Sequence, residues 1–215
     1  MIIAIDGPAG SGKSTIAGFI KGILDGVIPQ EDHEKYLSIA YDEANRLKEL
    51  TKDIVDVAKL ESGSMALNKE KFNLNELTQE VYMEMEELVK EKNLDFILDD
   101  KLGNIVITAD KARMRQVMIN VINNSMKFTE KGSIKIALGR VDEKISIVIE
   151  DTGIGIKKDK LSYLFDKFYT ANDYGDATTG AGLGLNIVKN IVDLHGGKVE
   201  IESEINKGTK VSILL

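Results

Sequence analysis

The sequence predicts an α+β protein in which a helical hairpin precedes an α/β sandwich domain. The fifty residues after about Ala17 have the apolar spacing of helices and contain no second strand. From residue 63 onward, short strand-like runs are interleaved with helical segments, which is typical of helices packed on one face of a mixed sheet. We therefore expect a strand–loop–helix fragment in residues 1–17, a helical hairpin in residues 14–62 and the sandwich in residues 63–215.

Composition limits what the chain can do. With 43% apolar and 29% charged residues among 215, it has the make-up of a folded protein. The net charge of −7 argues against nucleic acid as a partner, because no basic block offsets it. The chain has no cysteine and only two histidines, which excludes disulfides, thiolate catalysis and Cys- or His-rich metal sites. No apolar run approaches the roughly 20 residues of a membrane helix, so we expect no membrane contact and a cytoplasmic setting.

The hairpin is predicted from two apolar stripes. The first helix covers residues 14–28, and Pro29 with the polar residues after it separates this helix from a second one that runs to about Leu60. The stripe of the second helix alternates steps of three and four over three heptads, as in a coiled-coil seam. Its members are Leu37, Ala40, Ala44, Leu47, Thr51, Ile54 and Ala58. Two helices cannot bury such a seam alone, so we expect a homodimer in which two hairpins form a four-helix bundle.

The sandwich domain is expected to follow a linker around Gly63. Asn73 and Asp110 are suited to begin helices, since their side chains can accept a hydrogen bond from the first free backbone amides. A helix over residues 182–194 should stop at Gly196. Strands are predicted over residues 65–72, 94–98, 104–108, 133–138, 144–150, 198–203 and 209–214, with a helical turn over 161–168 and a flexible stretch over 170–179.

Two glycine runs stand out within this domain. Asp151-Thr152-Gly153-Ile154-Gly155-Ile156 directly follows a predicted strand, and Gly180-Ala181-Gly182-Leu183-Gly184-Leu185 follows about thirty residues later. Glycine lets a backbone turn tightly and lie close to a flat or anionic ligand, because it has no Cβ. A single run is usually no more than a turn between two elements, whereas two runs with a single acid at the head of the first favour a ligand site.

An asparagine-rich helix lies upstream of both runs. Asn120, Asn124 and Lys127 stand at positions i, i+4 and i+7, so they share one helix face. Amide oxygens are suitable ligands for Mg²⁺, which also binds the phosphate oxygens of its substrates, and a lysine adds a positive charge for phosphate. The alternative is an ordinary solvated helix face. Beside the glycine runs, the triplet favours a site for Mg²⁺ and a nucleotide.

These motifs together resemble a known family. Residues from about 18 to 215 resemble the dimerisation and catalytic core of a bacterial sensor histidine kinase with a GHKL-type ATP-binding domain. Five segments carry the resemblance: 120–128 resembles the N-box, 151–156 the first glycine box, 164–169 the F-box, 180–185 the second glycine box, and Gly208-Thr209 the last, short glycine box.

The resemblance implies roles for single residues. Asp151 would accept a hydrogen bond from the amino group of adenine, with Thr209 in the same network. Asn124 would bind Mg²⁺ and Lys127 would contact phosphate. Residues 170–179 would form a lid over ATP or ADP. The implied ATP site comprises Asn120, Asn124, Lys127, Asp151, Gly153, Gly155, Phe165, Phe168, Gly180, Gly182, Leu183, Gly184 and Thr209. The glycines would let the nucleotide and the lid approach the backbone, and the two phenylalanines would pack against the lid or serve as core aromatics.

Three departures from the family pattern affect activity. Thr170 stands where many relatives carry an arginine, which weakens the expected closure on phosphate. The last glycine box lacks a second glycine. Asn120 occupies the place where hydrolytic GHKL relatives carry a glutamate, and an amide cannot act as a general base, so fast ATP hydrolysis is not expected.

The first 17 residues carry a second, unrelated phosphate motif. Gly7, Gly12, Lys13 and Ser14 form the P-loop pattern after an apolar run and before a helix, in which lysine reaches the terminal phosphates and serine holds magnesium. The segment resembles the start of a cytidylate kinase or a related nucleoside monophosphate kinase, but the resemblance ends near Ala17. We interpret the chain as a chimera whose P-loop has lost its sheet, with a nucleotide-binding P-loop as the alternative.

The histidine that accepts phosphate in histidine kinases is missing from its expected place. An ungapped alignment puts that position at about Gly7, inside the P-loop. His33-Glu34 is a weak substitute at the turn of the hairpin, and His195 at a helix end is expected to cap or pack. We therefore expect an ATP-binding core without stable autophosphorylation, whose parent kinase acts on a response regulator. The alternatives are a nucleoside monophosphate kinase-like phosphotransferase and a non-catalytic ATP-binding dimerisation module.

Overall fold

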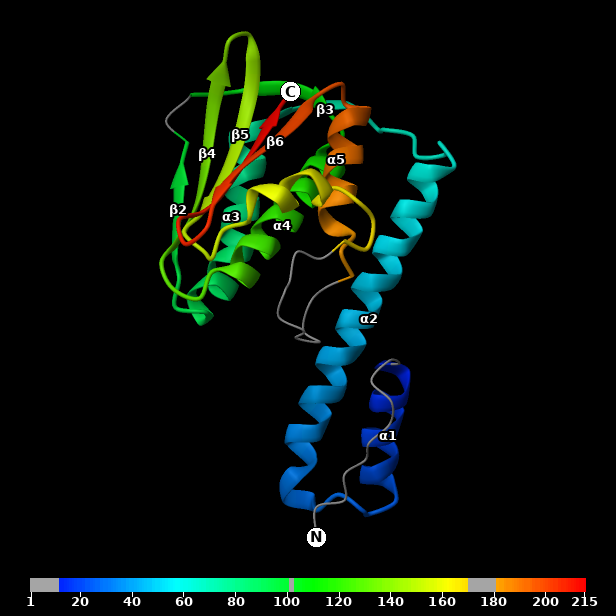
Figure 1. Ribbon diagram of the computed structural model, residues 1–215. Coiled ribbons are helices and arrows are strands. Elements are labelled where there is room, and N and C mark those ends of the chain that lie inside the picture. The colour runs from blue at the N-terminus through cyan, green and yellow to red at the C-terminus, as the bar shows by residue number, and fades with distance from the viewer. Residues whose placement is uncertain (1–11, 101–102, 170–180) are drawn as a thin grey trace. The chain divides into compact units, whose positions relative to one another are not determined.

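The computed structural model describes residues 12–100, 103–169 and 181–215 (Figure 1). Predictions for residues 1–11, including Gly7, and for residues 170–180, including Thr170 and Gly180, lie outside the described residues. The chain divides into two compact units, Met1–Val55 and Asp56–Leu215, and each is described by itself.

The first unit is a helical hairpin. Helix α1 (Gly12–Leu24) begins with Gly12, Lys13 and Ser14 of the P-loop pattern, and helix α2 (His33–Glu61) follows a 3₁₀ helix, η1 (Gln30–Asp32). Both predicted helices are confirmed, although α1 ends four residues early. It ends there because Gly26 adopts a left-handed φ of +66°, and the amides of Val27 and Ile28 then bond back to the carbonyl of Gly22.

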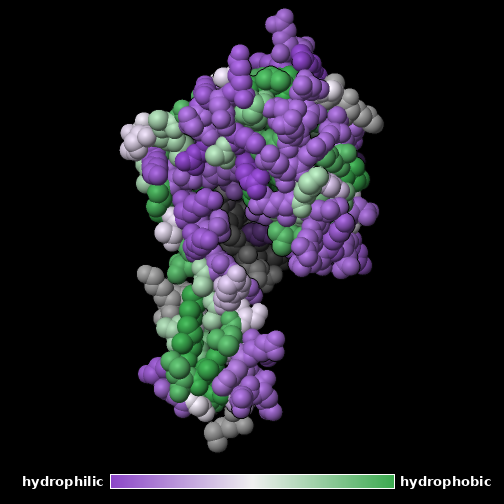
Figure 2. Space-filling view, turned by 180° about the vertical axis from the view of Figure 1, so that it is seen from behind, coloured by the Kyte–Doolittle hydropathy of each residue, from purple (hydrophilic) through white to green (hydrophobic). Residues whose placement is uncertain are grey.

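The hairpin leaves much of its apolar surface exposed. Ile28 and Ala40 are its buried apolar side chains among residues 15–55, whose burial is described. Figure 2 shows apolar side chains gathered along one face of this unit. The exposed large apolar residues in the described part of the hairpin are Ile20, Leu24, Val27, Leu37, Ile39, Tyr41, Ile54 and Val55. Phe19 and Tyr36 bring α1 and α2 together, with ring centroids 5.1 Å apart.

The second unit is built on a five-stranded mixed sheet with the order β2-β4-β5-β7-β6. Strand β2 is parallel to β4, and every other neighbouring pair in this sheet is antiparallel. The strands are β2 (Asp95–Asp99), β4 (Ser133–Val141), β5 (Lys144–Asp151), β6 (Lys198–Glu204) and β7 (Gly208–Leu214). Strands β1 (Glu70–Asn73) and β3 (Val106–Ala109) form a separate two-stranded sheet.

Helices α3 (Leu74–Glu91), α4 (Lys111–Phe128) and α5 (Gly184–Leu194) cover one face of the large sheet (Figure 1). Asn73 caps α3 by accepting from the amide of Asn75, and Asp110 caps α4 by accepting from the amide of Arg113. The predicted α+β architecture and both caps are confirmed. None of the helices in the described ranges combines the length and apolar character that crossing a bilayer requires.

Several predicted elements differ from the observed ones at their ends, and three of them bear on the argument. Residues 65–72 were expected to be a strand, but β1 covers only Glu70–Asn73. The helical turn expected at 161–168 is a 3₁₀ helix, η2 (Lys158–Tyr163). Helix α5 begins at Gly184 rather than at Gly182, because Gly182 has a φ of +68°, which no right-handed helix contains.

The second unit begins inside α2, seven residues before the glycine at which the sequence suggests a linker. Asp56 and Val57 are the reason, since both are buried in this unit. The carboxylate of Asp56 accepts hydrogen bonds from the Arg113 guanidinium at 3.0 Å and from the Gln116 amide at 2.8 Å. Val57 belongs to the same hydrophobic core as the sandwich helices. The last turns of α2 are therefore part of the sandwich unit.

Candidate nucleotide-binding site

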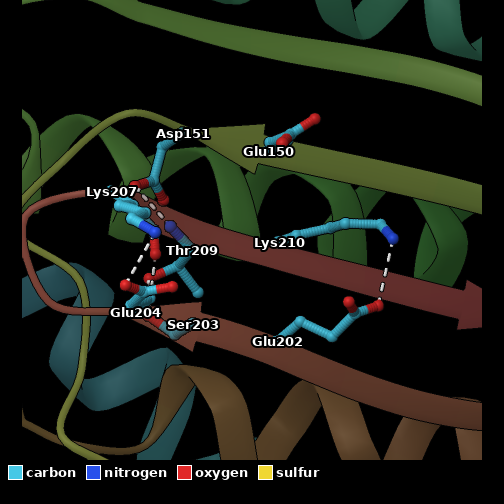
Figure 3. Close-up of a pocket in the computed structure, with 9 residues that line it drawn as sticks. Glu150, Asp151, Glu202, Ser203, Glu204, Lys207, Thr209 and Lys210 are labelled. Atoms are coloured by element: carbon cyan, nitrogen blue, oxygen red, sulfur yellow. Dashed lines mark hydrogen bonds and ion pairs between the residues drawn. The ribbon is translucent and has the colours of Figure 1, made fainter.

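Asp151 lies at the end of β5 (Figure 3), and its carboxylate is held by three hydrogen bonds. Its Oδ1 accepts from the backbone amides of Gly153 at 3.0 Å and Thr209 at 3.1 Å. Its Oδ2 accepts from the hydroxyl of Ser125 at 3.0 Å. The side chain is 7% exposed. Three elements (α4, the turn after β5, and β7) therefore meet at one carboxylate.

The electrostatics of Asp151 follow from this enclosure. Burial raises the pKa of its carboxyl above the ordinary value for aspartate. The hydrogen bonds from Gly153, Ser125 and Thr209 stabilise the ionised form and oppose the rise, and the nearby charge of Glu150 adds to it. A carboxylate placed this way is an acceptor whose partners fix its position.

The first glycine run makes a turn that the chain itself requires. A Cβ on Gly153 would lie 2.2 Å from the carbonyl oxygen of Phe128, a separation that real Cβ atoms do not reach. Gly155 has a φ of +68°, and a Cβ there would lie 2.0 Å from the carbonyl oxygen of Glu204. Both glycines thus let the turn pass the end of α4 and the β6–β7 connection. Approach of a nucleotide to the same backbone stays a prediction.

The amides of Asn120 and Asn124 meet at the start of α5. Asn120 Nδ2 donates to the Gly184 carbonyl at 3.4 Å. A Cβ on Gly184 would lie 3.9 Å from Asn124 Nδ2 and 4.0 Å from Asn120 Nδ2, so both side chains lie beside this residue. The N-terminus of a helix carries unpaired N–H groups and favours anions. Two amides and a helix start are therefore gathered where the sequence predicts phosphate and metal.

Lys127 belongs to the same face of α4, but its ammonium lies 4.8 Å from the ring centroid of Phe128. The structure therefore places Asn120 and Asn124 together at α5, with Lys127 near the C-terminal end of α4. Among the described residues, no group of three or more acidic or histidine side chains is arranged to hold a metal ion. A metal here would depend on amide oxygens and on oxygens of its ligand.

The segment that resembles the F-box lies beside the second glycine run. The amide of Phe168 donates to the carbonyl of Gly182 at 3.1 Å, and Asn186 donates to the carbonyl of Phe165 at 2.8 Å. Phe168 is 67% exposed with a φ of +61°, so its core-aromatic alternative is wrong. Leu183, by contrast, is a core residue, 1% exposed. These contacts hold together the two segments that flank residues 170–180.

A cavity of about 340 Å³ opens at the ends of β5, β6 and β7 (Figure 3). It is lined by Glu150, Asp151, Glu202, Ser203, Glu204, Lys207, Gly208, Thr209 and Lys210. Its charges are largely paired within it, since Lys210 contacts Glu202 at 3.0 Å and Lys207 contacts Glu204 at 2.8 Å. Only Asp151 and Thr209 of the predicted site residues line this cavity, so it is not the whole predicted site.

Sequence reasoning missed two serines of this site. Ser125 donates to Asp151, and Ser203 donates to the Gly208 carbonyl at 2.8 Å while its hydroxyl lies 2.9 Å from that of Thr209. Ser125 did leave a signal. It follows Val117 and Val121 at four-residue steps, so it falls on the buried face of α4. A hydroxyl on such a face needs a partner.

Both histidines have structural roles. His195 Nδ1 lies 2.8 Å from the carbonyl of Ile191, and its Nε2 accepts from the amide of Asp110 at 3.0 Å. It therefore connects the end of α5 to the start of α4, in agreement with the capping or packing role expected from the sequence. His33 Nε2 lies 2.9 Å from the carbonyl of Ile28 and stabilises the hairpin turn.

Comparison with known proteins identifies the second unit. Residues 109–215 match the family model described as histidine kinase-, DNA gyrase B- and HSP90-like ATPase. This part of the chain belongs to that ATPase family. The catalytic domain of the histidine kinase ThkA has the same fold, with 33% identity and a TM-score of 0.60, and the match covers 70% of this chain and 95% of that domain.

Longer relatives are sensor histidine kinases, which are ATP-dependent transferases. The sensor histidine kinase YclK of Bacillus subtilis is 34% identical over 205 residues, which cover 94% of this chain and 43% of YclK. ThkA in complex with the response regulator protein TrrA is 29% identical with a TM-score of 0.75, covering 95% of this chain and 57% of that one. The chain thus spans less than half the length of YclK. The resemblance of residues 18–215 to histidine kinases is confirmed for the ATPase domain, whereas the resemblance of residues 1–17 to cytidylate kinases finds no support.

Proposed function

We propose that this chain is the ATP-binding catalytic core of a sensor histidine kinase. The observation that carries the proposal is the anchored carboxylate of Asp151 in a domain of the histidine kinase ATPase family. Three hydrogen bonds fix this acceptor at the end of β5. A purine with an exocyclic amino group offers the complementary donor, and Thr209 lies in the same network.

The other side of the proposed site handles phosphate and metal. When bound, Mg²⁺ neutralises phosphate charge, and Asn124 would supply an amide oxygen to it. Asn120 would hold the start of α5 in place through its bond to Gly184, and the amides of that helix start would face phosphate. Lys127 would contribute positive charge. Gly153, Gly155, Gly180, Gly182 and Leu183 would supply backbone to the pocket, and Phe165 and Phe168 would flank its lid, residues 170–179.

The proposed core lacks an internal acceptor. His33 is bonded to a hairpin carbonyl and His195 is bonded through both ring nitrogens, and the chain has no other histidine. We therefore expect no stable autophosphorylation. The response regulator is a proposed partner of the parent kinase, supported by the ThkA–TrrA complex.

The P-loop pattern is not part of the proposed site. P-loop proteins place their phosphate loop between a central strand and a helix of a parallel sheet. In residues 12–55, the described part of the first unit, the elements are helices and no strand accompanies them. We infer that residues 1–17 are a foreign fragment joined to the kinase core, and its residues 12–17 lie in helix α1.

The hairpin is proposed to form a four-helix bundle with a second copy. Its exposed apolar residues support this, since a single hairpin of 13- and 29-residue helices leaves them in water. A second copy would cover them.

Nucleotide affinity of the intact chain and two variants tests the proposal. We expect Mg²⁺-ATP to bind the parent and Lys13→Ala equally and to bind Asp151→Asn much more weakly. Loss of nucleotide affinity in Lys13→Ala alone would indicate that the nucleotide binds at the P-loop instead. Incubation with γ-labelled ATP supplies a second readout, and acid-labile, base-stable label on the protein would contradict the missing acceptor. Because the chain is expected to lack an acceptor histidine, phosphate transfer is assayed with the acceptor hairpin of another histidine kinase supplied in trans, and binding without transfer to that hairpin would indicate a non-catalytic ATP-binding module.

A further inference from the structure

Ser125 is the one side chain among the three donors that hold Asp151. The other two donors are backbone amides of the turn after β5 and of β7, and both bind Oδ1. Ser125 comes from α4 and binds Oδ2 at 3.0 Å. It is 3% exposed, so water does not substitute for it. The hydroxyl donates, because an ionised carboxylate can only accept.

Anchoring both oxygens fixes the plane of the carboxylate. The torsion that turns an aspartate carboxylate is soft, so amides on Oδ1 alone would leave Oδ2 free to swing. A donor on Oδ2 from a separate element removes that freedom. An ionised carboxylate has about four acceptor positions, and the three hydrogen bonds described above occupy two on Oδ1 and one on Oδ2. The remaining position for a ligand donor is therefore on Oδ2.

The same bond joins the two ends of the proposed site. Ser125 directly follows Asn124, the proposed Mg²⁺ ligand, and Asp151 is the proposed contact to the base. A hydrogen bond between α4 and β5 at this point keeps the base-binding end in register with the phosphate-binding end.

We propose that Ser125 is a positioning residue that holds Asp151 Oδ2 and thereby sets the preference for a purine bearing an amino group at position 6. The inference rests on the proposed ATP site. A purine without that amino group makes no bond to Oδ2, so its affinity does not depend on where Ser125 holds this atom.

The test compares two ligands on the full-length chain with Mg²⁺. ADP carries the amino group, and purine riboside 5′-diphosphate carries a hydrogen in its place. Ser125→Ala is expected to bind ADP about tenfold more weakly, the effect of losing a hydrogen bond to a charged group, while its affinity for the analogue stays within about twofold. Ser125→Cys keeps nearly the same volume with a weaker donor and gives a smaller change in the same direction, so it serves if the alanine variant does not fold.

Ser146→Ala is the matched control. Ser146 is equally buried, 3% exposed, and stands on the same strand as Asp151, five residues away or about 17 Å. The Ser146→Ala variant should therefore bind ADP and the analogue as tightly as the parent does. Equal losses for ADP and the analogue in the Ser125 variants, or no loss for either, would overturn the role of Ser125 while the ATP site stands. If the parent chain binds neither ligand, the proposed function fails and this inference fails with it.

Discussion

The hairpin and the sandwich bury their apolar residues to very different extents. In the hairpin, Ile28 and Ala40 are the buried apolar side chains of residues 15–55, while eight large apolar residues are exposed. In the sandwich, α3, α4 and α5 enclose a continuous core with the sheet, and Leu74, Met114 and Ile147 are fully buried. The sandwich thus has a continuous core of its own, whereas most of the large apolar residues in the described part of the hairpin are exposed.

The first prediction tests where the self-sufficient unit begins. Arg113→Met leaves the carboxylate of Asp56 buried without its guanidinium partner, and we expect the free energy of unfolding to fall by about 3 kcal/mol. Urea unfolding measures this. Arg115→Met is the control on the same helix, because its ion pair with Glu84 is more exposed than that of Arg113 with Asp56 and should contribute less than about 1 kcal/mol. Equal losses of stability in the two variants would contradict the assignment of the last turns of α2 to the sandwich unit.

The second prediction separates function from stability within the sandwich. Asp151→Asn should weaken ATP binding by about a hundredfold, the effect of losing a charged acceptor in a buried site. Glu150→Gln, an exposed neighbour on the same strand, should not change binding. Titration calorimetry gives both affinities, and comparable losses would argue for a general charge effect.

Although Asp151→Asn should weaken ATP binding, it should not lower the stability of the fold and can raise it. Because burial raises the folded-state pKa of Asp151, its contribution to stability is present below the unfolded-state pKa of about 3.9 and is lost as pH rises through the folded-state pKa. Ionised Asp151 therefore costs folding free energy at pH 7. The asparagine variant should match or exceed the parent's melting temperature at pH 7, with a smaller advantage at pH 4. A clear drop at pH 7 would contradict this.

The third prediction concerns the missing partner of the hairpin. The intact chain should sediment as a dimer, and Leu37→Glu should raise the dimer dissociation constant at least about tenfold, since a charge would enter an apolar interface. Ser38→Glu puts the same charge on the next, exposed residue and should have little effect. A strict monomer at high concentration in analytical ultracentrifugation would show that the exposed face has another purpose.

The smallest expected effect concerns a buried hydroxyl group in the sandwich. Thr129 Oγ1 is a buried atom without a hydrogen-bond partner in the described part of the chain. Thr129→Val should therefore raise the free energy of unfolding by about 1 kcal/mol. Thr78→Val should instead lower it, because the Thr78 hydroxyl donates to the Leu74 carbonyl at 2.8 Å. Destabilisation by both would indicate that Thr129 has a partner, such as an ordered water.

Sequence patterns predicted the fold well where the signal is local. The caps at Asn73 and Asp110 and the hairpin of β4 and β5 depend on neighbouring residues, and all are observed. The extension of the sandwich into α2 was not predicted, because Asp56 is one acid among many on a polar helix until Arg113, 57 residues later, reaches it. The hydrogen bond from Ser125 to Asp151 was missed for the same reason, because it joins two residues that are distant in the sequence.

The residues of the candidate site stay a prediction from the sequence, and the structure shows part of the geometry expected for them. Spacing placed Asn120 and Asn124 on one helix face, and the structure brings both to Gly184. Phe168, by contrast, is exposed, because its left-handed backbone turns the side chain away from the core. The exposure of such a side chain depends on the backbone conformation at that residue, and the spacing of residues in the sequence does not predict that conformation.

The crowding at Gly153 and Gly155 changes what variants of the glycine runs can be used to show. An added methyl group would meet the carbonyl oxygens of Phe128 and Glu204 before it met any ligand. A Gly155→Ala protein that fails to bind nucleotide would therefore report a displaced chain crossing, not a lost contact to phosphate. The glycines of this motif are required in part because the backbone is crowded there, whether or not a ligand binds. Evidence for the ligand therefore has to come from side chains that can be replaced without disturbing the fold.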